Sequence, residues 1–351
     1  MHSESNSGRL PVVFIGVLAL AAAVGLVVSL RNSPSGPVVV VYSALDEQFS
    51  RPILERFTDQ TGIRVLAKYD TESTKSVGLT QALLAERARP RCDVFWNNEI
   101  VNTLRLSRGS LLQDCDSAVF EQFPAEYRSK SDLWCGFAAR ARVLLVNTDL
   151  VNKDAMPTSI EDLCDPQWKN RVGIAKPLAG TTASHAACLF AVWGEERAKE
   201  FFRCLKANAQ VLGGNKQVAR AVATGALAFG LTDTDDALIE LEAGYPVEIV
   251  YPDQGEGKLG TLFIPNTIAM IEGAPHKDSA KRLIEYLLSS EVEQTLAAGP
   301  SAQIPLRPGE SKSDRVESPE TVQAMQVDFE EAAENWDVAA QFLRREFAAA
   351  D

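Results

Sequence analysis

The sequence predicts an α/β fold, because segments with the pattern of buried strands alternate with segments that have the spacing of amphipathic helices. Residues 38–42 form a β-branched run, and the apolar side chains of residues 46–57 recur at helical spacing. Gly62 is placed to end that helix, and residues 63–67 resume as a strand. A strand, a helix and a strand in this order form a β-α-β unit, which is typical of a parallel sheet.

The same alternation continues along the chain, and the last third is largely helical. We expect further strands at residues 92–96, 141–146, 171–175, 226–231, 247–250 and 262–264. We expect helices at residues 75–87, 99–107, 182–192, 195–206, 216–224, 234–242, 277–289, 291–298 and 319–349.

Composition limits the class of protein and its partners. The 351 residues are 23% charged and 46% apolar, which is typical of a soluble globular chain with material for about two domains. The chain has 35 Lys and Arg against 47 Asp and Glu, a net charge of −12, and no basic cluster. A surface of this charge repels phosphate backbones, so we exclude nucleic acid as a partner.

The N-terminal segment predicts export. Residues 10–30 are uncharged and mostly apolar between Arg9 and Arg31, long enough as a helix to cross a hydrocarbon core of about 30 Å. The segment is either a cleaved signal peptide or a retained membrane anchor, and residues 33–37 then form a polar tether. Both interpretations place the rest of the chain in the periplasm or another extracytoplasmic space.

The cysteines gain a possible role from this compartment, because exported proteins can form disulfides. The pairs closest in sequence are Cys115 with Cys135 and Cys188 with Cys204, but sequence spacing does not choose among the possible pairings. Buried free thiols are the alternative. The six residues are Cys92, Cys115, Cys135, Cys164, Cys188 and Cys204.

Several predicted strands are followed directly by small or oxygen-bearing polar residues. In open α/β sheets, ligands bind beyond the carboxyl ends of the strands, so these loops predict one ligand site. The alternative for most of them is helix capping or turn formation. The candidates are Ser43, Asp46, Asn97, Asn98, Glu99, Thr181, Thr182, Asn215, Asp233, Asp235 and Asp236, and residues 71–75 form a further polar cluster.

Four segments between residues 38 and 298 carry a resemblance to a known family. They are VVVYSALDEQFSRPILERFTDQTGIRV, DVFWNNE, GGNKQVARAVATGALAFGLTDTDDA and LFIPNTIAMIEGAPHKDSAKRLIEYLLSSEVEQ. In this order they resemble the periplasmic solute-binding proteins of ABC importers, in the branch that contains the ferric-ion-binding proteins. The resemblance implies a two-lobed periplasmic-binding-protein fold of type II, in which each lobe is a mixed, mostly parallel sheet with helices on both faces. Lobe one would comprise residues 38–137 and 262–351, lobe two residues 138–261, with the ligand in the cleft between them.

The same resemblance bears on the ligand. Ferric-binding relatives use a histidine, a glutamate and two adjacent tyrosines, and the matching positions here are Asp46, Asn98 beside Glu99, Asp235 and Asp236. The tyrosine pair is absent, which argues against the family's usual iron site. Carboxylate and amide oxygens suit hard cations such as Fe³⁺, Mn²⁺, Ca²⁺ or Mg²⁺, or an amine-bearing solute. The tentative metal ligands are Asp46, Glu99, Asp235 and Asp236, and the ion would be the transported ligand, not a required cofactor.

Enzymatic function is disfavoured. The chain contains three histidines and no GxSxG motif, so a histidine-based catalytic triad has few candidates. Residues 255–260 match GxGxxG, but they precede a strand and do not open a helix, which excludes a dinucleotide site.

The predicted function is the substrate-binding component of an ABC transporter. It would capture a metal ion or a small polar solute in the cleft, close around it and deliver it to an inner-membrane permease. We expect a monomer, in contact with the membrane only through the N-terminal segment. The alternative is a membrane-anchored sensor that uses the same fold without transport.

Overall fold

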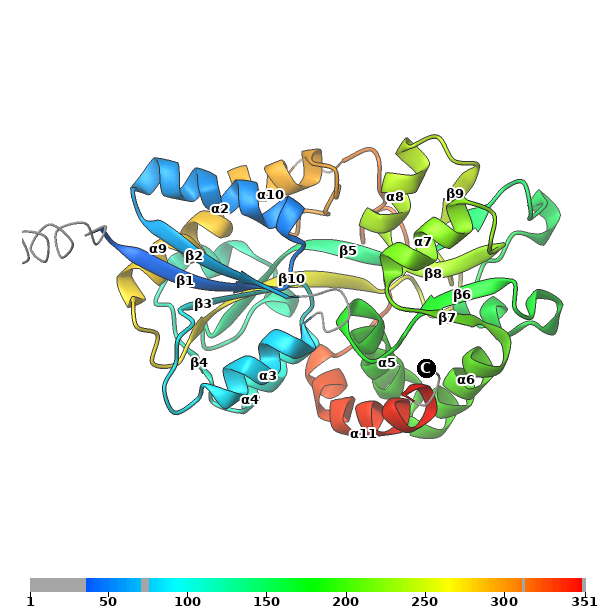
Figure 1. Ribbon diagram of the computed structural model, residues 1–351, viewed down its shortest axis with the longest axis horizontal. Helices are drawn as coiled ribbons and strands as arrows, with labels where there is room; N and C mark the ends of the chain where they lie inside the picture. The colour runs from blue at the N-terminus through cyan, green and yellow to red at the C-terminus, as the bar shows by residue number, and fades with distance from the viewer. Residues whose placement is uncertain (1–35, 71–75, 311–312, 349–351) are drawn as a thin grey trace, which may run out of the picture. The chain divides into compact units, whose positions relative to one another are not determined.

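The computed structural model describes residues 36–70, 76–310 and 313–348. Within these ranges, the chain from Val38 onward forms one compact unit around a sheet of ten strands (Figure 1). The strands are β1 (Val38–Ser43), β2 (Arg64–Tyr69), β3 (Val94–Asn97), β4 (Leu112–Gln113), β5 (Trp134–Asn147), β6 (Val172–Ala175), β7 (Gln210–Leu212), β8 (Phe229–Asp233), β9 (Val247–Val250) and β10 (Phe263–Ile271).

The sheet is mixed, with its parallel pairs at the two ends and antiparallel pairs in the middle. The main order is β2-β1-β3-β10-β5-β8-β6-β7, with β4 beside β10 and β9 beside β5. Strands β1, β2 and β3 pair in parallel, and so do β6, β7 and β8. The long strands β5 and β10 pair antiparallel and connect these two sets, which we call the first and the second strand group.

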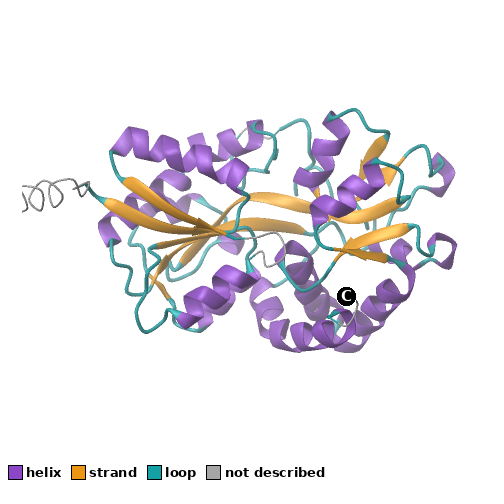
Figure 2. Ribbon diagram, viewed as in Figure 1, coloured by secondary structure: helices purple, strands orange, loops and turns teal. Residues whose placement is uncertain are grey.

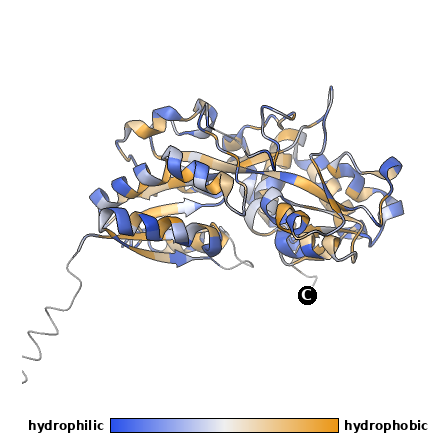
Figure 3. Cartoon of the chain, turned by 90° about the horizontal axis from the view of Figure 1, so that it is seen from above, coloured by the Kyte–Doolittle hydropathy of each residue, from blue (hydrophilic) through white to orange (hydrophobic). Residues whose placement is uncertain are grey.

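Helices cover both faces of the strands, as the α/β prediction requires (Figure 2). Seen from above, they carry hydrophilic and hydrophobic residues in alternation, which is the pattern of helices that pack one side on a sheet (Figure 3). They are α2 (Glu47–Thr61), α3 (Val77–Ala85), α4 (Val101–Arg108), α5 (Gly180–Trp193), α6 (Glu195–Asn208), α7 (Asn215–Ala223), α8 (Thr234–Glu242), α9 (Lys277–Leu287), α10 (Ser290–Ala298) and α11 (Phe329–Phe347).

Helix α11 begins ten residues later than the expected range of 319–349. Asp328 caps it, because its side chain accepts hydrogen bonds from the N–H groups of Glu330 and Glu331. The residues before it run alongside Thr261, whose C=O accepts a hydrogen bond of 2.9 Å from Met325 N–H. The backbone on either side of Ala324 therefore bonds to Thr261 and does not form a helix.

Strand β5 is much longer than the expected 141–146, and all of its residues are buried. It pairs with β10 along its first half and with β8 and β9 along its second half. This length matters for the site, because it brings Arg140 into the middle of a buried strand.

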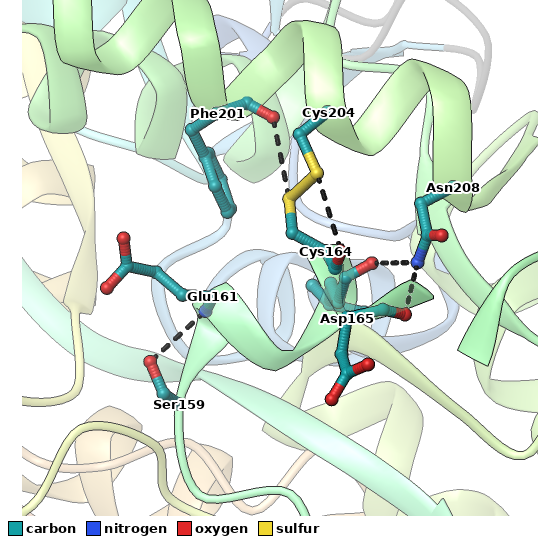
Figure 4. Close-up of a disulfide and its surroundings, with 8 residues drawn as sticks. Ser159, Glu161, Cys164, Asp165, Phe201, Cys204 and Asn208 are labelled. Atoms are coloured by element: carbon teal, nitrogen blue, oxygen red, sulfur yellow. Dashed lines mark hydrogen bonds between the residues drawn. A yellow bond between two sulfur atoms is a disulfide. The ribbon is translucent and has the colours of Figure 1, made fainter. Parts of the chain in front are cut away.

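A disulfide joins Cys164 to Cys204, a pairing that the sequence left open (Figure 4). It links a short 3-10 helix (Ile160–Cys164) to α6. The side-chain amide of Asn208 supports the same junction by donating hydrogen bonds to the C=O groups of Leu163, at 2.8 Å, and Asp165, at 3.0 Å. The remaining four cysteines are buried free thiols: Cys92, Cys115, Cys135 and Cys188.

Helix α11 contacts elements on both sides of the predicted lobe boundary. Phe342 packs against Phe190 of α5 with ring centroids 6.1 Å apart, while Arg108 of α4 forms ion pairs with Glu330 and Glu334. The assignment of residues 262–351 to lobe one therefore stays a prediction, and the last helix packs on both predicted lobes.

The predicted signal peptide or anchor at residues 10–30 lies outside the described residues, as does the polar cluster at 71–75. Among the helices of the described ranges, none combines the length and the apolar character that crossing a bilayer requires.

Candidate functional site

A cavity of about 410 Å³ lies where β3, β6, β7 and β8 end and where α5, α7 and α8 begin. Seven of the eleven predicted ligand residues line it, together with an arginine and a lysine. The polar lining residues are Asn98, Arg140, Lys176, Thr181, Thr182, Asn215, Asp233, Asp235 and Asp236, and three glycines also line it: Gly180 at the start of α5, and Gly213 and Gly214 before α7.

The floor of the cavity is built on Arg142 and Asp233, which are neighbours across the β5–β8 pair. Both side chains are buried, and Arg142 donates to Asp233 Oδ1 at 2.6 Å. The other oxygen of Asp233 accepts from Thr181 at 2.6 Å and from Asn215 Nδ2 at 3.0 Å. Arg142 also donates to the hydroxyls of Thr181 and Thr182, each at 3.3 Å. Asp233 is therefore fully engaged with groups of the protein.

The electrostatics of the floor keep Asp233 ionised. Burial alone would raise the pKa of Asp233, but the adjacent Arg142 and Arg140 outweigh it and hold the pKa below its ordinary value. Burial lowers the pKa of nearby His185 to about 3, with a further contribution from Arg142, so its imidazole is neutral at physiological pH.

Arg140 connects the two strand groups at the cavity wall. It lies two residues before Arg142 on β5, so both side chains project to the same face of the strand. Its guanidinium donates to the C=O of Asn98, which follows β3, and pairs with Asp235 Oδ2 of α8 at 3.4 Å. A buried guanidinium that contacts residues from both groups makes this position sensitive to their relative placement.

Three of the predicted acids come together as the sequence suggested. Carboxylate oxygens of Asp233, Asp235 and Asp236 lie within 4.8 Å of one another at the start of α8. Asp233 is the N-cap residue of α8 by position, but its side chain forms no capping hydrogen bond. The carboxylate of Asp235 accepts instead from the N–H of Asp236, at 3.0 Å.

Glu99 is fully buried and does not line the cavity. Its carboxylate accepts hydrogen bonds from Asn97 Nδ2 at 2.7 Å, from the N–H of Asn102 and from Ser184 Oγ of α5 at 2.6 Å. Asn97 also donates to the C=O of Glu99, the turn-forming bond that was the alternative to ligand binding. These side chains are occupied in joining β3 to α4 and α5.

Asp46 and Ser43 also lie apart from the main cavity. Asp46 precedes α2 without a side-chain capping bond and lines a separate hollow of about 220 Å³ with Asp70 and Lys216. Ser43 is buried, and its hydroxyl donates to the C=O of Leu45 at 3.2 Å. Of the four tentative metal ligands, the structure thus brings together Asp235 and Asp236 and places Asp46 and Glu99 elsewhere.

Sequence analysis missed Arg140 and Arg142. The signal was present, because two arginines interrupt an otherwise uncharged run in WCGFAARARVLLVN. A charge within a buried strand must be paired, and a spacing of two puts both on one face.

Replacing Ser184 with Ala should lower the free energy of unfolding by about 2 kcal/mol, because the buried carboxylate of Glu99 loses a short hydrogen bond. Chemical denaturation measures this change. Ser290→Ala is the control, because Ser290 is also a helical serine but is less buried, and its hydroxyl accepts a surface hydrogen bond of 3.3 Å from Gln294. Equal stability of the two variants would contradict the role assigned to Ser184.

Comparison with known proteins then assigns the family. The profile of the family described as bacterial extracellular solute-binding protein matches residues 104–335, well over half of the chain. The chain belongs to the bacterial extracellular solute-binding proteins. This membership confirms the prediction of a solute-binding component of an uptake system and the prediction that it is not an enzyme.

Two curated relatives and one solved structure illustrate the range of this family. Iron uptake protein A1 of Synechocystis is 27% identical to this solute-binding protein over 292 residues, 78% of this chain and 79% of its own length. A putative 2-aminoethylphosphonate-binding periplasmic protein of Salmonella typhimurium is 26% identical over 300 residues, 82% of this chain and 85% of its own.

The solved structure confirms the fold. Iron-bound HitA of Pseudomonas aeruginosa superposes with a TM-score of 0.81 at 23% sequence identity, over 88% of this chain and 99% of the other. The solute-binding protein therefore has the type II periplasmic-binding-protein fold that the resemblance implied.

Proposed function

We propose that this protein captures a small solute that carries both an anionic and a cationic group, and delivers it to the permease of an ABC importer. The observation that carries the proposal is the cavity of about 410 Å³, in which two uncapped helix starts face a cluster of acids. The cavity volume fits a small molecule better than a bare ion.

The anionic group would lie at the first turns of α5 and α7. The residues preceding these helices are Ala179 and Gly214, which have no side chain able to cap the helix. Their first N–H groups are the kind of donor that binds phosphate, phosphonate or carboxylate oxygens. Thr182 lines the cavity beside them, and its hydroxyl donates to Asn215 Oδ1 of α7 at 3.1 Å. Lys176 on the same wall adds positive charge.

The cationic group would lie at Asp235 and Asp236. Arg142 pairs with Asp233 and Arg140 pairs with Asp235, and both of these acids are buried. Asp236 is the most exposed of the three, and it is the acid best placed to meet an amine. A zwitterion such as 2-aminoethylphosphonate, which the Salmonella relative is named for, has this distribution of charge.

Ferric ion is the second candidate, favoured by the convergence of Asp233, Asp235 and Asp236 and by the name of the Synechocystis relative. Two buried arginines beside those acids oppose the approach of a trivalent cation. No tyrosine is present among the lining residues in the described part of the chain.

Isothermal titration of the chain from Val38 onward with 2-aminoethylphosphonate, inorganic phosphate and ferric citrate tests the proposal. We expect the phosphonate to bind, and Thr182→Val to weaken this binding about tenfold, because the hydrogen bond from Thr182 to Asn215, which joins the starts of α5 and α7, is lost. The matched control is Thr224→Val, whose hydroxyl bonds only within α7 and its C-terminal end. Binding of ferric citrate alone, unaffected by Thr182→Val, would contradict it.

A further inference from the structure

Strand β5 is irregular two residues before Arg140. Its register with β10 shifts by one between the pairs Ile264–Arg140 and Asn266–Phe137, so two residues of β5 face the single residue Pro265. One of these two, Ala138, has a φ of 45°, a conformation that costs free energy for a residue with a Cβ. The surrounding structure must therefore hold this bulge in place.

The carboxylate of Glu293 is the main support of the bulge. Glu293 belongs to α10 and is completely buried. Its Oε1 accepts from the N–H of Ala138 at 3.0 Å and from the N–H of Leu306 at 2.9 Å, while Oε2 accepts from the N–H of Arg307 at 3.2 Å. Burial raises the pKa of Glu293, and these three N–H groups act in the opposite direction. All of these hydrogen bonds go to backbone N–H groups.

The other polar groups of the bulge are also satisfied. Asn266 Nδ2 donates to the C=O of Ala138 and to Gln303 Oε1. Ala139 and Ile304 exchange two backbone hydrogen bonds of 2.7 and 2.8 Å. A bulge with every N–H and C=O engaged has one defined geometry, and bulges beside binding sites redirect the side chains that follow them.

We infer that Glu293 is a positioning residue for ligand binding, which acts through the bulge at Ala138 to place Arg140 against Asn98 and Asp235. Glu293 does not line the cavity and would not touch the solute. Arg140 is two residues beyond Ala138, on the strand that connects the two strand groups. A small change of the strand at Ala138 would displace a guanidinium whose contacts lie on both groups.

The test combines binding with a signal that needs no ligand. Glu293→Ala removes the carboxylate that accepts the three N–H bonds. Glu293→Gln keeps the size of the side chain but leaves only one acceptor oxygen, and it replaces the alanine variant if that variant does not fold. Glu291→Gln on the same helix is the control, because Glu291 is half-exposed and pairs with Arg56 at the surface. The second signal is the ¹⁵N Nε resonance of Arg140, assigned with Arg140→Lys; this Nε is buried without a partner in the described structure.

We expect the Glu293 variants to shift the Arg140 resonance and to weaken 2-aminoethylphosphonate binding about tenfold, with no change in Glu291→Gln. In a variant that combines a Glu293 change with Arg140→Ala, the loss of affinity should equal that of Arg140→Ala alone, because both changes act on the same guanidinium. An unchanged Arg140 resonance, or additive losses of affinity, overturns the inference. The binding measurement rests on the proposed function, whereas the resonance does not. If the wild-type protein does not bind 2-aminoethylphosphonate, the proposed function is contradicted. The Arg140 Nε resonance still tests the role of Glu293 in that case.

Discussion

Arg142→Met is expected to lower the free energy of unfolding by about 4 kcal/mol and to abolish ligand binding, because it leaves the buried carboxylate of Asp233 without its charged partner. The change also removes donors from the hydroxyls of Thr181 and Thr182 at the start of α5. Denaturant titration measures the stability, and calorimetry measures the binding. A loss below 1 kcal/mol would contradict the assignment of Arg142 as the partner of Asp233.

Two controls separate charge from packing. The double variant Arg142→Met with Asp233→Asn removes both charges and should recover part of the stability, while binding stays lost. The second control is the pH dependence of the free energy of unfolding. The folded pKa of Asp233 lies below its unfolded value of 3.8, so its stabilisation is present above pH 3.8 and is lost as the pH falls through the folded pKa. The double variant lacks the Asp233 carboxylate, so the loss of stability that its protonation causes at low pH should be absent.

Loss of the disulfide is expected to lower the free energy of unfolding by about 3 kcal/mol, because the bond closes a loop between residues 40 positions apart and so restricts the conformations of the unfolded chain. Thermal unfolding of Cys164→Ala with Cys204→Ala measures the change. Wild-type protein in reductant should match this double variant, and reductant should not affect the variant itself. Equal stability of wild-type protein with and without reductant would show that the bond does not form in solution.

The fold was largely predictable because its signals are local. The β-α-β opening follows from a β-branched run, helical spacing and Gly62, whose φ of 69° and N–H bond to Thr58 end α2. The termini of β5 and α11 were not predictable in the same way. The first half of β5 has β10 as its partner, and Ala324, within the expected helix, forms a β-bridge with Thr261, so both depend on contacts far apart in sequence.

The sequence predicted the residues of the site that follow the ends of strands, but it did not predict the buried arginines that pair with them. Polar residues after strands gave Thr181, Asn215 and Asp235, since strand ends converge at one edge of a sheet. Glu99 has the same sequence pattern, but burial and the hydroxyl of Ser184 engage it inside the protein. Arg140 was missed because the expected strand began one residue after it.

The charge balance of the floor could not be read from the acids alone. Asp233 and Asp235 suggest a cation site when their arginine partners are unknown. Because Arg140 and Arg142 pair with these acids, the site contains both positive and negative charges. The choice between a metal ion and a zwitterionic solute therefore depends on residues whose role only the three-dimensional pairing reveals.

A crystal structure of the protein soaked with 2-aminoethylphosphonate and ferric citrate together decides which ligand the cavity takes. We expect phosphonate oxygens on the first N–H groups of α5 and α7, with the amine beside Asp236. A lone iron ion held by Asp233, Asp235 and Asp236, with Arg140 and Arg142 turned away and no phosphonate in the cavity, would contradict the proposed function.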